Sequence, residues 1–211
     1  MSTKLPYQSS EIEFVERKSR FIGNVFPVYS EAEAREMIAM VEKLHDAANH
    51  VVYAYDISSE NVTRFSDAGE PKGTAGMPVY EIFRREGLTC YCCTVTRYFG
   101  GILLGAGGLI RAYANTAKLA LEAAGIAELM PYELVRIVCS YSHYDIVRAF
   151  LRDYEHTVEH TDFLQDVTID ISIPAHIYTG ICEGILNRTA GRASVERLET
   201  RMRPQRIERN K

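Results

Sequence analysis

Two glycine-rich stretches, each close to basic residues, are the part of this sequence best suited to bind an anion. SDAGEPKGTAGMP occupies residues 66–78, and RYFGGILLGAGGLIRAY occupies residues 97–113. Nine of the 14 glycines lie between Gly69 and Gly108. Ordering glycine costs more backbone entropy than ordering any other residue, so this concentration needs a local cause.

Bare backbone of this kind can offer N–H groups to a phosphate. Turns in residues 69–76 favour convergence of successive N–H groups on one anion. Gly105 to Gly108 precede a helix whose first N–H groups and positive dipole end attract negative charge. The predicted phosphate- or nucleic-acid-binding residues are Lys72, Gly73, Thr74, Gly76, Arg97, Tyr98, Gly100, Gly101, Gly105, Gly107, Gly108, Arg111 and Lys118. Glycines that merely permit tight turns and close packing are the alternative explanation, and the chain has neither a Walker pattern nor a dinucleotide fingerprint.

The same loops could instead carry acid–base chemistry. Asp67, Glu70 and His50 are then the candidate catalytic groups of an enzyme acting on a small phosphorylated or nucleotide-like substrate. No Ser-His-Asp or Cys-His set is identifiable in the sequence. A cofactor and a metal site are not expected.

The composition is that of a folded globular protein. Of 211 residues, 46% are hydrophobic and 25% charged. The first residues lack the apolar run of a secretory signal, and no segment approaches the roughly 18 apolar residues of a membrane span. The five cysteines are an odd number and are expected to be free thiols, with Cys90, Cys92 and Cys93 in core packing rather than at a zinc ion. We expect a cytoplasmic protein without membrane contact.

The net charge of -4 conceals two basic zones. Residues 64–118 carry 7 basic and 4 acidic groups, and residues 188–211 carry 8 and 3. Residues 119–187, in contrast, carry 3 basic and 11 acidic groups. The basic end of the chain is consistent either with a solvated tail or with contacts to phosphate backbones.

Strands and helices must position the two glycine-rich stretches. The capping box Ser30-Glu31-Ala32-Glu33 predicts a helix over residues 31–45. Good helix formers predict a second, mostly buried helix from Gly107 to about residue 124, ended by Gly125. Composition predicts strands at 20–28, 50–57 and 89–99, with the last at the centre, and alternation predicts a further strand at 79–85 that pairs with it.

A second series of predicted strands and helices begins near residue 130. It comprises strand 132–141, helix 143–154, strands 157–163 and 167–174, helix 176–190 and strand 194–202. The order β-α-β-β-α-β is that of a ferredoxin-like sandwich, in which two helices cover one face of an antiparallel sheet. We therefore predict two domains, residues 1–130 and 131–211.

SDAGEPKGTAGMPVYEIF and VTRYFGGILLGAGGLIRAYANTA together resemble the two-part signature of the IMPACT (YigZ-type) family. AANHVVYAY, residues 47–55, is similar to a histidine-containing strand entry upstream of that signature, and the match extends over about residues 14–125. The resemblance implies an α+β chain. Its N-terminal domain would be a ribosomal-protein-like α/β sandwich with a left-handed β-α-β unit, and its C-terminal ferredoxin-like domain would be similar to the last domain of elongation factor G.

The resemblance also implies a function. Relatives are associated with translation control and with binding to nucleic acid or the ribosome. We therefore expect a non-catalytic RNA- or ribosome-binding protein involved in regulation of translation, and a phosphate-bearing small molecule is the alternative ligand. In one respect the chain departs from the family, which usually has two adjacent aspartates before Gly-Glu-Pro. Ala68 stands in place of the second aspartate, which disfavours a paired-carboxylate metal site.

Overall fold

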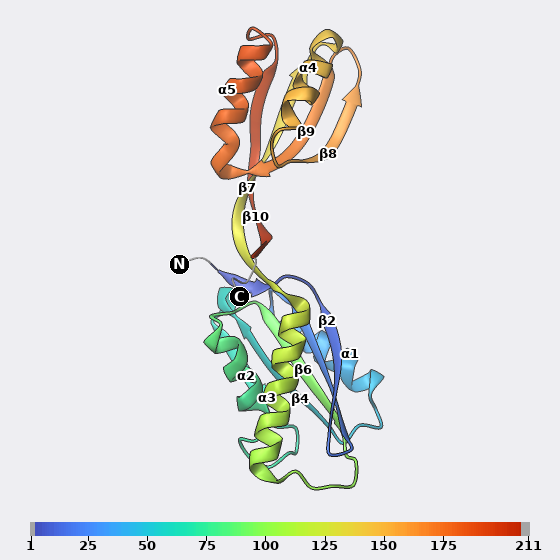
Figure 1. Cartoon of the computed structure of the whole chain (residues 1–211). Helices are drawn as coiled ribbons and strands as arrows, with labels where there is room; N and C mark the ends of the chain where they lie inside the picture. The colour runs from blue at the N-terminus through green and yellow to red at the C-terminus, as the bar shows by residue number, and fades with distance from the viewer. Residues whose placement is uncertain (1–2, 208–211) are drawn as a thin grey trace. The chain divides into compact units, whose positions relative to one another are not determined.

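The structure is a computed structural model that describes residues 3–207. The chain divides into two compact units (Figure 1). The first unit runs up to Leu129 and includes the chain again from Pro204, and the second unit is Met130–Arg203. The last four residues of the basic tail, 208–211, lie outside the described residues.

The described part of the first unit contains an antiparallel sheet with strand order β2-β3-β6-β4-β5. Its strands are β2 (Ser10–Glu16), β3 (Ser19–Pro27), β4 (His50–Ile57), β5 (Val62–Ser66) and β6 (Tyr91–Tyr98). β6 lies between β3 and β4, and its residues are buried up to Arg97. The prediction of a central strand within residues 89–99 is confirmed.

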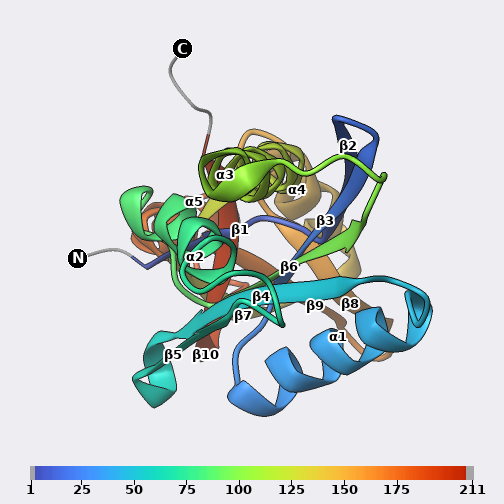
Figure 2. The ribbon, with the colours of Figure 1, turned by 90° about the horizontal axis from the view of Figure 1, so that it is seen from below.

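Helices cover both faces of this sheet (Figure 2). They are α1 (Glu31–Leu44), α2 (Gly76–Arg85) and α3 (Gly105–Ala124). On one face, Ala34 of α1 packs in a cluster that includes Cys92. On the other face α2 and α3 pack together, and Phe83 stacks on Tyr91 with ring centroids 4.1 Å apart. The sheet is therefore the middle of three layers.

α1 and α3 begin and end close to the predicted residues. The Ser30 hydroxyl accepts a hydrogen bond from the Glu33 N–H at 3.2 Å, which is the predicted cap of α1. α3 ends at Gly125, whose φ of 71° is readily adopted by glycine. Within residues 3–207, α3 and the other helices are too short or too polar to cross a bilayer.

The predicted strand at residues 79–85 is wrong, because these residues form most of α2. Over seven residues the alternating pattern also fits a helix, since Val79 and Phe83 are four apart and share one buried face. Pro78 is tolerated because the first helical turn needs no N–H donors. Arg84 and Arg85 sit in the last turn, where cations interact favourably with the helix dipole.

The second unit has the predicted β-α-β-β-α-β order. Its elements are β7 (Ile126–Cys139, which begins in the first unit), α4 (Tyr141–Leu151), β8 (Thr157–Phe163), β9 (Val167–Pro174), α5 (Tyr178–Arg188) and β10 (Ser194–Ile207, which ends in the first unit). β9 lies between β7 and β8, and β10 pairs with β7. β1 (Lys4–Pro6) pairs with the start of β7. The expected α+β fold, with a ferredoxin-like C-terminal part, is confirmed.

Two glycines of α5 allow a matched test of how closely α4 and α5 pack. A Cβ at Gly184 would lie 2.2 Å from Phe150 Cζ, whereas a Cβ at Gly180 would have no described atom within 4 Å beyond its chain neighbours and the backbone of its own helix. We expect Gly184→Ala to lower the free energy of unfolding by about 1–3 kcal/mol through overpacking. Gly180→Ala should leave it unchanged or raise it by up to about 1 kcal/mol. Urea unfolding measures both, and equal effects would contradict the close packing at Gly184.

Candidate functional site

Both glycine-rich stretches lie at one end of the first unit's sheet. The first connects β5 to α2, and the second runs from β6 into the first turn of α3. The start of β4 lies at the same end, because His50 pairs with Arg97 in the antiparallel register. The fold therefore brings the start of β4, at His50, to the same end of the sheet as the start of α3, at Gly105, although the two are far apart in the chain.

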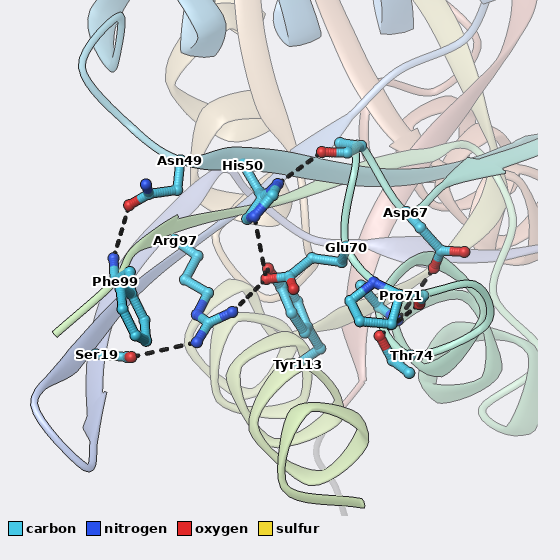
Figure 3. Close-up of polar contacts among 12 residues, drawn as sticks. Ser19, Asn49, His50, Asp67, Glu70, Pro71, Thr74, Arg97, Phe99 and Tyr113 are labelled. Carbon is cyan, nitrogen blue, oxygen red and sulfur yellow. Dashed lines mark hydrogen bonds and ion pairs between the residues drawn. The ribbon is translucent and has the colours of Figure 1, made fainter. Parts of the chain in front are cut away.

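Glu70 connects these segments (Figure 3). Its Oε1 accepts hydrogen bonds from Arg97 Nη1 at 2.7 Å and from the Tyr113 hydroxyl at 2.7 Å, and His50 Nε2 lies 3.9 Å away. Glu70 is 8% exposed and Arg97 is 5% exposed. Loss of either partner would leave an uncompensated buried charge, so this ion pair holds the first loop against β6 and α3.

The polar groups of Arg97 and Tyr98 contact neighbouring side chains of the first unit. The Arg97 guanidinium lies over the rings of Phe21 and Phe99, and its Nη2 donates to the Ser19 hydroxyl at 3.4 Å. The Tyr98 hydroxyl lies 3.0 Å from His45 Nδ1. Arg97 therefore pairs with the Glu70 carboxylate in this structure. The sequence suggested a phosphate as the partner of Arg97.

The groups around Glu70 have defined donor roles. Burial, followed by the hydrogen bond to Glu70 and its negative charge, raises the pKa of Tyr113 far above its ordinary value. Tyr113 therefore stays protonated and donates to Glu70. His50 Nδ1 lies 2.8 Å from the Ala68 carbonyl oxygen, which can only accept, so Nδ1 carries a proton. His50 joins β4 to the first loop.

The first glycine-rich loop does form an anion-binding nest, and Asp67 occupies it. Its carboxylate accepts from the backbone N–H groups of Gly73 at 2.7 Å, Ala75 at 3.1 Å and Gly76 at 2.9 Å. Burial by itself would raise the pKa of Asp67, but these hydrogen bonds outweigh it and the net pKa is lowered. The N–H groups of Gly73 and Gly76 are thus engaged within the protein. Thr74 is also engaged, since its hydroxyl donates to the Pro71 carbonyl at 2.6 Å.

In the second stretch, the N–H groups of Phe99 and Gly100 donate to Asn49 Oδ1 and to the Ser19 hydroxyl, whereas the first turn of α3 has no such acceptor among the described residues. α3 begins Gly-Ala-Gly-Gly, has no acidic residue in its first turn, and has no side-chain cap among the described residues. Arg111, one and a half turns further on, is exposed and has no hydrogen-bond or ion-pair partner within residues 3–207. Lys72 is exposed as well, whereas Lys118 lies 3.7 Å from Glu122. The start of α3 therefore combines free N–H groups with an unpaired cation.

A pocket of about 490 Å³ lies along the same part of α3. The helix contributes one wall, and β2 with the β2–β3 turn contributes the other. Its lining residues are Phe14, Glu16, Arg17, Leu104, Gly108, Arg111, Ala112, Ala114 and Asn115. Its volume falls in the range of small-molecule sites, and its walls are mainly apolar with a few polar groups.

The glycines of the second stretch differ in whether the surrounding structure leaves space for a Cβ atom. A Cβ at Gly100 would lie 1.9 Å from the Lys18 carbonyl oxygen, so the fold itself excludes a side chain there. Apart from its chain neighbours and the backbone of its own helix, a Cβ at Gly107 would meet only Arg111 Nη1, at 3.9 Å, among the described atoms within 4 Å, and the φ of Gly107 is not positive. Packing therefore explains Gly100 and does not explain Gly107.

Several residues of this region were missed by sequence reasoning. Tyr113 and Asn115 lie within the second part of the signature but are not among the predicted binding residues, and Ser19 and Phe14 belong to no motif. The adjacent cations Arg17 and Lys18, in the β2–β3 turn, were the sequence feature that could have indicated this wall of the pocket. Among the described residues, His, Cys, Asp and Glu side chains form no group of three placed to hold a metal ion.

Comparisons with known proteins cover both units. Residues 17–121 match the family model described as the Impact N-terminal domain, and residues 137–192 match a domain of unknown function, DUF1949. IMPACT family member YvyE of Bacillus subtilis is 32% identical over 190 residues, which are 90% of this chain and 88% of the relative. An IMPACT family member of Thermus thermophilus is 34% identical, over 85% of this chain and 98% of the relative.

Two further comparisons agree with these. IMPACT family member YigZ of Escherichia coli is 30% identical over 75% of this chain and 79% of its own length. A solved structure titled "Crystal structure of an hypothetical protein" is 26% identical and has a TM-score of 0.57. It covers 94% of this chain and 98% of its own.

The buried ion pair predicts a graded loss of stability. Glu70→Gln leaves the Arg97 charge buried without a partner and should lower the free energy of unfolding by about 3–5 kcal/mol. Tyr113→Phe removes one hydrogen bond to a charged acceptor and should cost about 1.5–3 kcal/mol. Urea unfolding measures both. Glu81→Gln, which breaks an exposed pair with Arg84, is the control and should have a much smaller effect. If Glu70→Gln matched Glu81→Gln, the ion pair would not hold the loop.

Asp67 predicts a pH dependence of stability. Because its pKa is lower in the folded than in the unfolded protein, its contribution is present above about pH 4 and is lost as the pH falls through the folded pKa. Asp67→Asn should therefore be less stable than wild type at pH 7, and this deficit should shrink below pH ~4. Thermal unfolding from pH 7 to pH 3 measures the deficit. A deficit independent of pH would show that the nest does not depend on the ionised carboxylate.

Proposed function

The chain belongs to the IMPACT family, and from this premise we propose that it is an RNA- or ribosome-binding protein that acts in the regulation of translation. Its phosphate-binding surface is the start of α3. The open N–H groups of the first turn beside the unpaired Arg111 are the observation that carries the proposal. They supply hydrogen bonds and positive charge at a helix start that no side chain of the described residues caps.

The neighbouring charges support the same surface. Arg17 and Lys18 in the β2–β3 turn and Lys72 in the first loop are exposed. Arg97 neutralises Glu70, whereas Asp67 keeps its negative charge and is stabilised by hydrogen bonds from backbone N–H groups. The exposed cations Lys18, Lys72 and Arg111 together outweigh this one carboxylate, which favours a polyanionic ligand.

The enzyme alternative has less support. General acid–base catalysis needs a group that can exchange a proton with the substrate. Asp67 accepts hydrogen bonds from three backbone N–H groups, and Glu70 accepts from Arg97 and Tyr113. Both carboxylates are committed to holding the loops, so binding is the better-supported role.

Replacing Arg111 tests the proposal. We expect Arg111→Ala to weaken binding to single-stranded RNA and to 16S or 23S ribosomal RNA fragments. The slope of log affinity against log salt should also fall by about 0.7–0.9, the value for one lost phosphate contact. Fluorescence anisotropy titrations at several salt concentrations measure both quantities.

Arg152→Ala is the matched control. Arg152 belongs to the second unit, is exposed, and carries the same charge. It should leave the affinity and the salt slope almost unchanged. If Arg111→Ala behaved like Arg152→Ala, or if wild-type protein bound none of the RNAs, the proposed function at α3 would be contradicted.

A further inference from the structure

We propose that the pocket between α3 and the β2–β3 hairpin binds one nucleotide unit, with the base beside Asn115 and the phosphate beside Gly107 and Arg111. This inference rests on the proposed function and adds to it the chemical class that the pocket selects. The ligand would be an unstacked nucleotide of a single strand, or the same nucleotide free in solution.

The composition of the pocket favours a ligand with both apolar and polar faces. Phe14, Leu104 and Ala112 supply apolar surface, and Asn115 and Arg111 supply hydrogen-bonding groups. A bare phosphate would leave the apolar part unfilled, whereas a purely apolar ligand would leave the polar groups without partners. A nucleobase has apolar faces and a polar edge, and it is joined to a phosphate.

Asn115 is the group suited to the base. It is half-buried, and its side-chain amide has no hydrogen-bond partner among residues 3–207. Neither its oxygen nor its nitrogen is among the buried unpaired atoms of the described residues, so the amide is accessible to a ligand. An amide offers one acceptor and two donors in a plane, which allows paired hydrogen bonds to a base edge.

Gly107 is the group suited to the phosphate. A glycine within a helix is less favourable than alanine by roughly 1 kcal/mol, and neither packing nor a positive φ requires glycine at this position. Close approach of a ligand to the backbone is the remaining physical reason for a bare Cα here. Arg111 Nη1 is the nearest atom to the missing Cβ position, at 3.9 Å.

The dimensions and charges of the pocket agree with one nucleotide. Gly107 adjoins the lining residue Gly108, and it is eight residues before Asn115, which corresponds to about 12 Å along the helix axis. The lining contains two arginines and one carboxylate, Glu16, whose Oε1 lies 4.0 Å from Arg17 Nε. The pocket therefore has a small excess of positive charge, as a phosphodiester requires.

Two substitutions that do not remove charge test the inference. Asn115→Ala should weaken binding of labelled single-stranded heptanucleotides of A, C, G or U by roughly tenfold for at least one base. Gly107→Ala should weaken all four by about threefold or more while leaving thermal stability unchanged or increased. Asn187→Ala and Gly180→Ala, in α5 of the second unit, are the matched controls and should bind like wild type.

AMP, CMP, GMP and UMP, used as competitors, distinguish the two sources of the nucleotide. If a nucleotide competes for wild-type protein and no longer binds Asn115→Ala, the result supports nucleotide binding in the pocket. If a nucleotide binds and no oligonucleotide does, the ligand is a free nucleotide and the proposed RNA-binding function fails. The Asn115 side-chain amide signal in the ¹⁵N spectrum, identified by its loss in Asn115→Ala, should shift on addition of the bound ligand.

The inference is overturned if Asn115→Ala and Gly107→Ala bind every probe like wild type. If Arg111→Ala then still weakens RNA binding, the proposed function survives without the pocket. The inference is also overturned if an RNA duplex competes as well as the single strands, since paired and stacked bases cannot enter the pocket.

Discussion

A buried ion pair between Glu70 and Arg97 is the contact on which the functional end of the first unit depends. It joins the loop after β5 to the end of β6, and Tyr113 extends it to α3. Because both charges are removed from water, neither side chain can leave without a large desolvation penalty for the other. The loop and the helix are therefore fixed relative to one another, and the start of α3 is presented in one position.

This arrangement separates anionic groups that serve the fold from cationic groups that face solvent. Asp67 fills the N–H nest of the first loop, and Glu70 neutralises Arg97. The first turn of α3 has no such internal anion among the described residues, so its N–H groups and Arg111 remain open. Under the proposed function, an external phosphate would accept hydrogen bonds there as Asp67 does in the first loop, because both provide oxygen acceptors for backbone N–H groups.

Sequence reasoning located most of the core elements and failed where local patterns are ambiguous. β6, α1 and α3 were predicted because continuous apolar runs and capping signals are strong local information. Residues 79–85 were misassigned, because a seven-residue segment satisfies both a two-residue and a 3.6-residue period. β2 was missed although its residues alternate, since Glu11 and Glu13 gave it a polar average. β1 and β5 are short edge strands, and pairing rather than composition defines them.

The sequence by itself determined the α+β class, the ferredoxin-like order of the second half, the family and the concentration of bare backbone near cations. These properties follow from composition and from spacing along the chain, which are local. Tertiary structure alone decided which cations are available, since Arg97 and Arg111 flank the same glycines and look alike in the sequence. Glu70 approaches one and not the other, and that choice depends on strand register and long-range packing, which no local pattern records.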